Sequence, residues 1–394
     1  MCNFCFVGAP FDKRLRYGIG VYKMIKRIIL IFLIFVCFIT TASAEETDLY
    51  KDQLEISGAD ELYDYVPDNV KDYLNEFSID FNDSDWVNSL TNENAFLHIF
   101  GFVKSGAKAP LKAFGIILAL IFLASVMESS LSPDSQNTVT YVTLLAVSVA
   151  LLNPIYSVIT ASVEVLKGCS YFMTAFIPVF AAILAASGKP LTSASMNGVL
   201  LISANFVTYI ANFAVIPLMS GHLSLSIASS VSPLLQNTNL ANTIKKISLW
   251  VMGFISTLFI GILSIQTAVN SSADTLSVKT AKFIVGSTVP VAGGVLAEAL
   301  TTVTASLNLL KSSVGIWGVL ICALTFLPLV IELLLWRVCL WGLAFFGDTF
   351  SLSKISNLLK SVDSVLSVLV GIVLLSFAMF TISLTVVILG GKAV

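Results

Sequence analysis

Residues 314–335 read VGIWGVLICALTFLPLVIELLL, a run in which Glu332 is the single charged side chain. A helix needs about 20 apolar residues to cross the hydrocarbon of a bilayer, so this run predicts a transmembrane helix. The whole chain shares this character, because 56% of its 394 residues are hydrophobic, 12% are charged and the mean hydropathy is +0.90. Soluble domains carry about 25% charged residues. The composition therefore predicts an integral membrane protein.

Other apolar runs of similar length precede and follow this one. Lipid cannot satisfy the open edge of a strand, so only helices fit these runs. We therefore predict an all-α, polytopic helical membrane protein with about seven to eight transmembrane helices. The expected spans are residues 113–127, 139–159, 169–186, 198–219, 247–265, 314–335 and 365–389, with a less regular run at 283–300.

The N-terminus has the three parts of a cleavable export signal. Basic residues precede an apolar run at 28–39, and Ala42 and Ala44 then form an A-x-A exit before two glutamates. We predict cleavage after Ala44, so that residues 1–44 are an N-terminal extension with a signal peptide. Translation from Met1 and translation from Met24 both fit this pattern.

Residues 45–108 differ from the rest of the chain. Between residues 45 and 100 many residues are acidic, and the basic residues are only two lysines, Lys51 and Lys71. Apolar residues recur at helical spacing around Tyr73. We predict a small acidic, mostly helical extracytoplasmic region, followed by a multi-span transmembrane domain over residues 109–394. A solvated acidic linker explains the same composition equally well.

Two apolar segments share a pattern. Residues 176–185 read FIPVFAAILA, and residues 288–297 read TVPVAGGVLA. This similarity is consistent with an inverted repeat of three helices, which is how many transporters are built, and equally with chance. Under either interpretation the small and helix-breaking residues are candidate packing positions. They are Pro178, Pro290, Gly293 and Gly294.

Lys279 and Lys282 are three residues apart and so share one helical face. A buried ammonium group in lipid needs water, carboxylate or phosphate. We therefore expect both lysines at the membrane surface, where they anchor a helix that packs against the Pro178 segment.

Several polar residues interrupt the apolar runs. Asn205 and Asn212 are two turns apart and Asn153 precedes a proline. Glu332 within a span costs about 2.5–3.5 kcal/mol unless it has a partner or faces water. We predict that Arg337, five residues later, forms an interfacial pair with Glu332 that marks a helix end.

Sites for metals, nucleotides or catalysis are not predicted. Cys2 and Cys5 form a lone C-x-x-C, while His98 and His222 have no ligand type near them in the sequence. The chain has no P-loop, and we expect no enzyme activity and no cofactor. A net charge of −2 without basic clusters also argues against a nucleic-acid partner.

One region resembles a known family. Residues 266–269 (QTAV), 274–286 (DTLSVKTAKFIVG) and 306–315 (SLNLLKSSVG) resemble stage III sporulation protein AE of endospore-forming bacteria. The order of features agrees over nearly the whole chain after the export signal, and residues 1–23 depart from the family pattern.

The resemblance implies a non-enzymatic integral membrane subunit of a sporulation-specific, secretion-like channel complex. It would lie in the mother-cell membrane around the forespore and be required for late forespore development. Its implied partners are the other membrane proteins of the stage III sporulation A operon, their ATPase, a forespore-side channel protein and the bilayer. The alternative is a self-sufficient secondary transporter built from inverted repeats.

Overall fold

The computed structural model describes residues 54–76, 79, 95–130, 133–210, 216–231 and 293–389, together with residues 243, 246–248, 250–251, 253–254, 257–266, 269, 274 and 280. The chain separates into Met1–Glu45 and Glu46–Val394, and every described residue belongs to the second part. The described residues form helices and turns without a strand, which confirms the all-α prediction. The predicted signal with Ala42 and Ala44 lies outside them.

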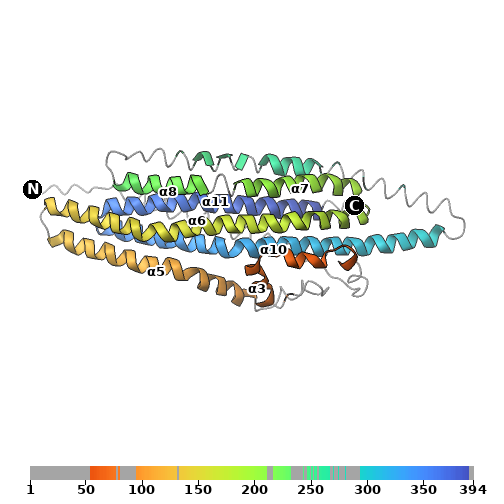
Figure 1. The fold of residues 1–394 in the computed structure, drawn as a ribbon, viewed down its shortest axis with the longest axis horizontal. Helices are drawn as coiled ribbons and strands as arrows, with labels where there is room; N and C mark the ends of the chain where they lie inside the picture. Colours follow the sequence, from red (N-terminus) through yellow and green to blue (C-terminus); the bar gives the residue numbers. More distant parts are fainter. Residues whose placement is uncertain are drawn as a thin grey trace, which may run out of the picture. The chain divides into compact units, whose positions relative to one another are not determined.

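Two helical hairpins supply the four longest helices. The first joins α5 (Ala95–Ser130) to α6 (Pro133–Ala186), and the second joins α10 (Gly293–Thr349) to α11 (Ser353–Leu389). These helices run side by side (Figure 1). The ring of Phe122 on α5 lies 6.3 Å from that of Phe350 in the α10–α11 turn. Both hairpin turns therefore lie at the same end of the bundle.

Two shorter helices extend the bundle on one side. Helix α7 (Pro190–Ile210) folds back along α6, and α8 (Ile216–Val231) contacts both α11 and α6. The Ser170 hydroxyl on α6 donates a hydrogen bond to the Ala204 carbonyl on α7 at 2.5 Å. Helix α7 thus covers the half of α6 that is far from the hairpin turns.

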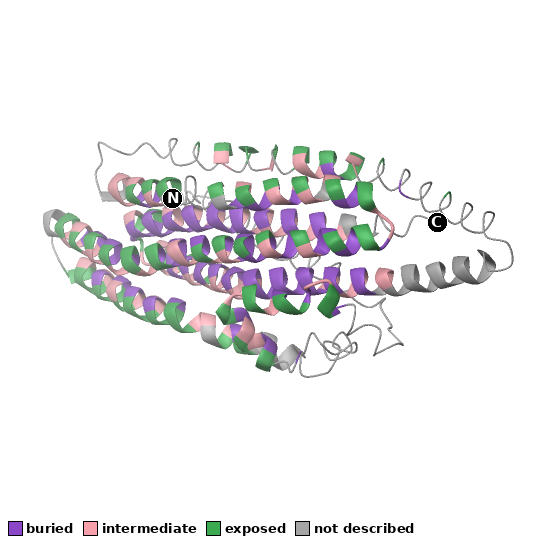
Figure 2. Ribbon diagram, turned by 45° about the vertical axis from the view of Figure 1, so that its right-hand side comes forward, coloured by how far each residue is buried: buried purple, intermediate pink, exposed green. Residues whose placement is uncertain are grey.

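Helices α10 and α11 form the centre of the bundle. In its most apolar window α10 is 67% buried and α11 is 56% buried, whereas α5 is only 28% buried (Figure 2). Large side chains of α6 and α10 fill the contacts around this centre, because dense packing maximises the apolar area that they remove from their surroundings. Trp317, Trp336, Phe172, Phe176 and Phe180 are all at most 1% exposed.

The expected number of transmembrane helices needs correction. Four described helices are long and apolar enough to cross a membrane, fewer than the seven to eight predicted. Their apolar segments are Gly101–Ser130, Gln136–Ala186, Leu310–Thr349 and Ser353–Thr385. The predicted spans 139–159 and 169–186 are one continuous helix, α6.

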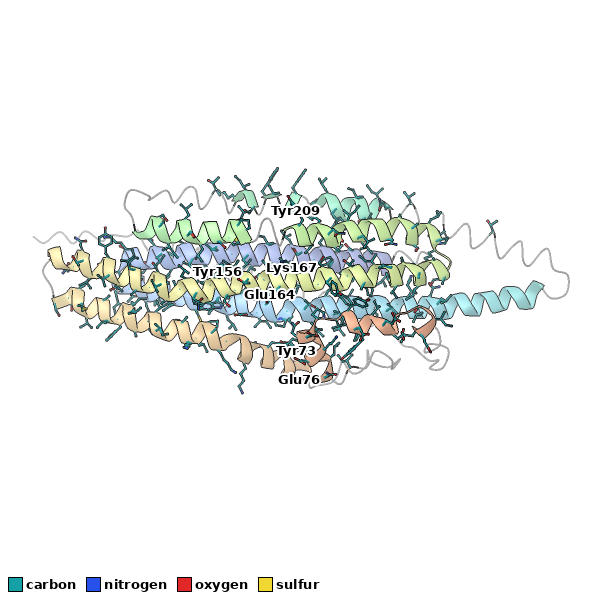
Figure 3. The ribbon with its side chains drawn as sticks, in the orientation of Figure 1. Tyr73, Glu76, Tyr156, Glu164, Lys167 and Tyr209 are labelled. Carbon is teal, nitrogen blue, oxygen red and sulfur yellow. The ribbon has the colours of Figure 1, made fainter. Side chains whose placement is uncertain are left out.

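The two predicted spans form one helix because polar residues between two apolar runs do not by themselves interrupt a helix. Glu164 and Lys167 separate the two runs, yet both are helix formers and stand exposed on α6 (Figure 3). Pro154 and Pro178 lie inside α6 as well. The three-helix repeat stays a prediction, because most of its second copy, between residues 247 and 292, lies outside the described residues.

The acidic segment contributes two short helices. The 3₁₀ helix η1 (Asp60–Tyr65) and α3 (Asp68–Glu76) pack on the long helices, with Tyr73 and Glu76 labelled in Figure 3. The Tyr73 ring meets Phe102 of α5 edge-on at 4.5 Å, and Tyr65 lies 6.0 Å from Tyr171 of α6. Burial, followed by the charges of Asp72 and Glu76, raises the pKa of Tyr73. Residues 54–76 are therefore a folded element and differ from a solvated linker.

Candidate functional site

The site begins at the corner between α6 and α7. The Lys189 amide donates to the Leu184 carbonyl at 3.1 Å, and the Gly188 amide donates to the Ala185 carbonyl at 3.1 Å. This is the Schellman arrangement, in which the residue after the helix takes a left-handed conformation. Gly188 has φ +81°, which glycine adopts without steric cost. The chain therefore turns sharply and starts α7 at Pro190.

Asp274 caps the N-terminus of α7 from a distant part of the chain. Its carboxylate oxygens accept hydrogen bonds from the Leu191 amide at 3.0 Å and from the Thr192 amide at 2.9 Å. The side chain is only 1% exposed. The first amides of a helix lack internal partners and carry partial positive charge, so a carboxylate stabilises them strongly. Asp274 thus fixes its own segment to the corner.

Two lysines complete this polar cluster, which we call the corner cluster (Lys189, Asp274 and Lys311). Lys311 of α10 is 2% exposed. Burial lowers the pKa of Lys189, and side-chain hydrogen bonding with Lys311 and the charge of Asp274 partly oppose that shift. The Ser187 hydroxyl also donates to the Leu307 carbonyl of α10 at 3.1 Å. Three segments distant in sequence therefore meet at one buried point.

The chemistry of the corner cluster favours a structural role. The Asp274 carboxylate joins its residue to α7 through charge-assisted hydrogen bonds from two backbone amides, and a side-chain hydrogen bond links Lys189 to Lys311. Among the described residues there is no group of three or more His, Cys, Asp or Glu side chains that could hold a metal ion. Asp274 and Lys311 both belong to the stretches that carry the family resemblance, so these stretches supply two of the three residues of the corner cluster.

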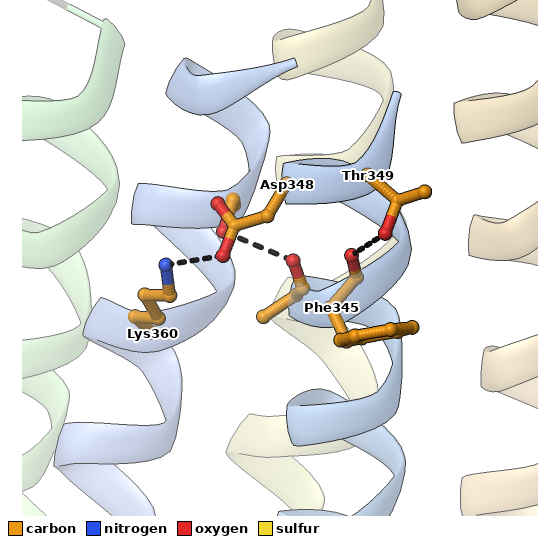
Figure 4. A network of polar contacts seen from close by, with 6 residues as sticks. Phe345, Asp348, Thr349 and Lys360 are labelled. Carbon is orange, nitrogen blue, oxygen red and sulfur yellow. Dashed lines mark hydrogen bonds and ion pairs between the residues drawn. The ribbon is translucent and has the colours of Figure 1, made fainter. Parts of the chain in front are cut away.

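A second set of charges joins α10 to α11. Arg337 donates from Nε to Asp363 Oδ1 at 2.8 Å and from Nη2 to Oδ2 at 3.4 Å, with both side chains buried. Lys360 Nζ binds Asp348 Oδ2 at 2.8 Å nearer the hairpin turn (Figure 4). The carboxylate that binds Arg337 at 2.8 Å therefore comes from α11, and the predicted pairing of Arg337 with Glu332 stays a prediction.

The other predicted polar positions do not converge in the described residues. Asn153 is exposed on α6, and the exposed Asn205 amide donates to the Leu201 carbonyl of its own helix at 2.9 Å. Glu332 is partly exposed where α10 approaches Gly106 of α5. Asn212 lies outside the described residues.

The predicted packing positions are only partly described. Pro178 lies within the α6 range and is exposed. Gly293 and Gly294 lie in the first turn of α10, and what packs around them is outside the described part of the structure. Lys279, Lys282 and Pro290 lie outside the described residues, so the anchored helix remains a prediction. The close approaches seen in the structure occur elsewhere. A Cβ at Gly318 would lie 2.6 Å from the Phe176 ring, and one at Gly315 would lie 2.6 Å from Ile388.

The sequence analysis missed three of these features. The sequence pattern that could have revealed each one differs. Asp363 stands at the edge of the apolar run 365–389, so the sequence marks it as a carboxylate in need of a partner without showing which one. Gly315 and Gly318 form a small-residue pair inside a span, which is a known sign of close helix packing. The link from Asp274 to the α7 N-terminus crosses about eighty residues and has no local signal.

Comparison with known proteins gives one family. Residues 69–391 match the family described as stage III sporulation protein AE. The chain is also similar to the stage III sporulation protein AE of Bacillus subtilis (strain 168), with 29% identity over 258 residues. That alignment covers 64% of this chain and 62% of the relative, so it spans less than two thirds of the relative's length. No solved structure matches the chain.

Proposed function

Because the chain belongs to the stage III sporulation protein AE family, we propose that it is a non-enzymatic membrane subunit of the channel complex that joins mother cell and forespore. The observation that carries this proposal is the family match over residues 69–391, which includes the four described helices that are long and apolar enough to cross a membrane.

The polar contacts of the bundle support a structural subunit over a catalyst. The Arg337–Asp363 pair and the corner cluster use their charges to join helices, and Asp274 has both carboxylate oxygens engaged by backbone amides. A catalytic group has to present its reactive atom to a substrate, whereas these groups are oriented toward the protein's own backbone and side chains.

The proposed setting has three parts. The long helices lie in the mother-cell membrane around the forespore, and residues 54–76 face the space between the two membranes. The partners are the other membrane proteins of the same operon, their ATPase and a channel protein on the forespore side. This assignment rests on the family and on the acidic, folded character of residues 54–76.

Deletion of the gene in the native spore-forming host tests the proposal. We expect normal vegetative growth, completed engulfment and arrest of the forespore afterwards, with restoration by the wild-type gene. An affinity-tagged chain purified from sporulating membranes should retain other membrane proteins of the complex. A growth defect that depends on one solute, with normal sporulation, would instead indicate the secondary transporter.

A further inference from the structure

Three sulfur atoms meet where α6 packs against α10. Cys169 Sγ lies 3.4 Å from Cys322 Sγ, and Cys322 Sγ lies 3.8 Å from Met173 Sδ. Cys169 and Met173 are one turn apart on α6, and all three side chains are 0% exposed. Both cysteines are free thiols. We propose that this sulfur cluster (Cys169, Met173 and Cys322) is a binding site for a soft monovalent metal ion of the Cu(I) type.

The spacing of the sulfur atoms fits three ligands of one ion. A bond between a metal and a thiolate is about 2.3 Å long, so three sulfurs in a plane around one ion lie about 4 Å apart. The two observed separations, 3.4 Å and 3.8 Å, are close to this value. Bringing all three sulfurs around one ion requires side-chain movement, which the unbranched Met and Cys side chains permit.

The ligand types select the ion. The described residues hold no group of three His, Cys, Asp or Glu side chains, so the third ligand is the Met173 thioether. Mg²⁺ and Ca²⁺ require oxygen ligands, and structural Zn²⁺ takes four ligands from Cys, His or carboxylate. Two cysteine sulfurs with one thioether are the soft set that favours Cu(I).

Charge balance also favours a monovalent ion. When Cu(I) binds the two thiols and the thioether, one thiol releases its proton to solvent and becomes a thiolate. The product contains one Cu⁺, one thiolate, one thiol and one thioether, so its net charge is zero and copper keeps its oxidation state. A neutral complex avoids the large cost of an uncompensated charge between buried apolar side chains.

Copper retention by the purified full chain tests the site. The background protein carries Cys2→Ser, Cys5→Ser and Cys37→Ser, because these cysteines could bind Cu(I) themselves. Cu(I) is supplied anaerobically with bathocuproine disulfonate as competitor, and copper per chain is measured after desalting. Variants Cys169→Ser, Cys322→Ser and Met173→Leu each remove one ligand. Cys339→Ser is the matched control, because Cys339 is a free thiol on the same helix as Cys322.

We expect about one copper per chain in the background protein and in Cys339→Ser, with a sulfur-only shell at about 2.3 Å in X-ray absorption. Each cysteine variant should retain less than about a tenth of that copper, and Met173→Leu should weaken binding by at least about tenfold. The inference is overturned if the folded background protein holds no copper or if the cysteine variants retain it. The inference is also overturned if Cys169 and Cys322 form a disulfide and the protein binds no copper.

Discussion

The Arg337–Asp363 ion pair sets the relation between α10 and α11 at the level of single residues. Removal of one partner leaves the other charge buried, and such changes cost about 3–5 kcal/mol. We therefore expect Arg337→Met to lower the free energy of unfolding by this amount in detergent. The double variant Arg337→Met/Asp363→Leu should recover most of the loss, because no unpaired charge remains.

Lys360 provides the matched control for that prediction. Its pair with Asp348 joins the same two helices at the same 2.8 Å, but the Lys360 side chain is 41% exposed. Exposed pairs contribute about 0–1 kcal/mol, so Lys360→Met should change stability by no more than that. Equal losses in Arg337→Met and Lys360→Met would show that burial of the Arg337 pair is unimportant.

Asp274 makes a second prediction at this scale. Asp274→Ala removes the acceptor of two amides at the start of α7, and only the Thr192 bond is fully buried. An unsatisfied buried donor costs about 1–3 kcal/mol. We expect a loss in that range, measured by thermal unfolding. Asp60→Ala is the control, because this exposed acid in η1 should change stability by no more than about 0.5 kcal/mol. A stable Asp274→Ala protein would mean that water replaces the cap.

The sequence predicted individual polar residues better than their partners. It marked Glu332 as costly within an apolar run and offered Arg337 as its partner, but the carboxylate that binds Arg337 is Asp363 on the next helix. A local pattern can pair residues three to five apart on one helix. It cannot show which residue of a neighbouring helix faces them.

At the scale of helices, Gly318 allows α10 to approach the aromatic ladder of α6. Phe172, Phe176 and Phe180 follow one another with centroids 5.6 Å and 5.2 Å apart, so the Phe176 ring has little room to move. We expect Gly318→Ala to destabilise the protein by about 1–3 kcal/mol through overpacking. The measurement is unfolding in detergent.

Gly198 on α7 is the control for Gly318, since a Cβ there meets nothing within 4 Å. Alanine is a better helix former than glycine by about 1 kcal/mol, so Gly198→Ala should be neutral or stabilising. The double variant Gly318→Ala/Phe176→Leu should regain part of the loss of Gly318→Ala. If both glycine variants behave alike, close approach at Gly318 contributes nothing.

Helix type was predictable from the apolar runs, whereas helix number was not. The sequence correctly placed helix at residues 139–159 and 169–186, yet it expected a break where Glu164 and Lys167 intervene. Whether two runs form one helix depends on what surrounds the polar turn between them. Here Pro67 lies 3.7 Å from the position that a Cβ would take at Gly168, so the acidic segment packs on that turn.

At the scale of the whole molecule, the acidic segment and the hairpin turns lie at different heights along α5. Phe102, which contacts Tyr73, and Ser129 are separated by about 40 Å of helix, more than the roughly 30 Å of hydrocarbon. We predict that a single cysteine at Glu61 reacts with an impermeant thiol reagent added on the extracytoplasmic side of the membrane. A cysteine at Ser129 should react only after permeabilisation.

Both labelling variants use a background without the six native cysteines, and both positions are exposed in the structure. Labelling of the Glu61 variant only after permeabilisation would reverse the predicted topology. Equal labelling of both positions in intact cells would mean that α5 does not cross the membrane. Composition predicted the membrane class, and the stretches between residues 266 and 315 carried the family resemblance. The order of elements along α5 required the packing of η1 and α3 on the bundle.

The unbroken length of α6 has a mechanical consequence. At about 1.5 Å per residue, Pro133–Ala186 extends about 80 Å, more than twice the thickness of the hydrocarbon. Because the helix is unbroken, the direction in which the side chains of one half point around the helix axis fixes that direction for the other half. Deleting a single residue near Glu164 would turn one half against the other by about 100°, and Cys169 and Phe176 would leave α10 while the hairpin half stayed in register. Deleting seven residues, close to two full turns, would shorten the rod and nearly preserve that direction.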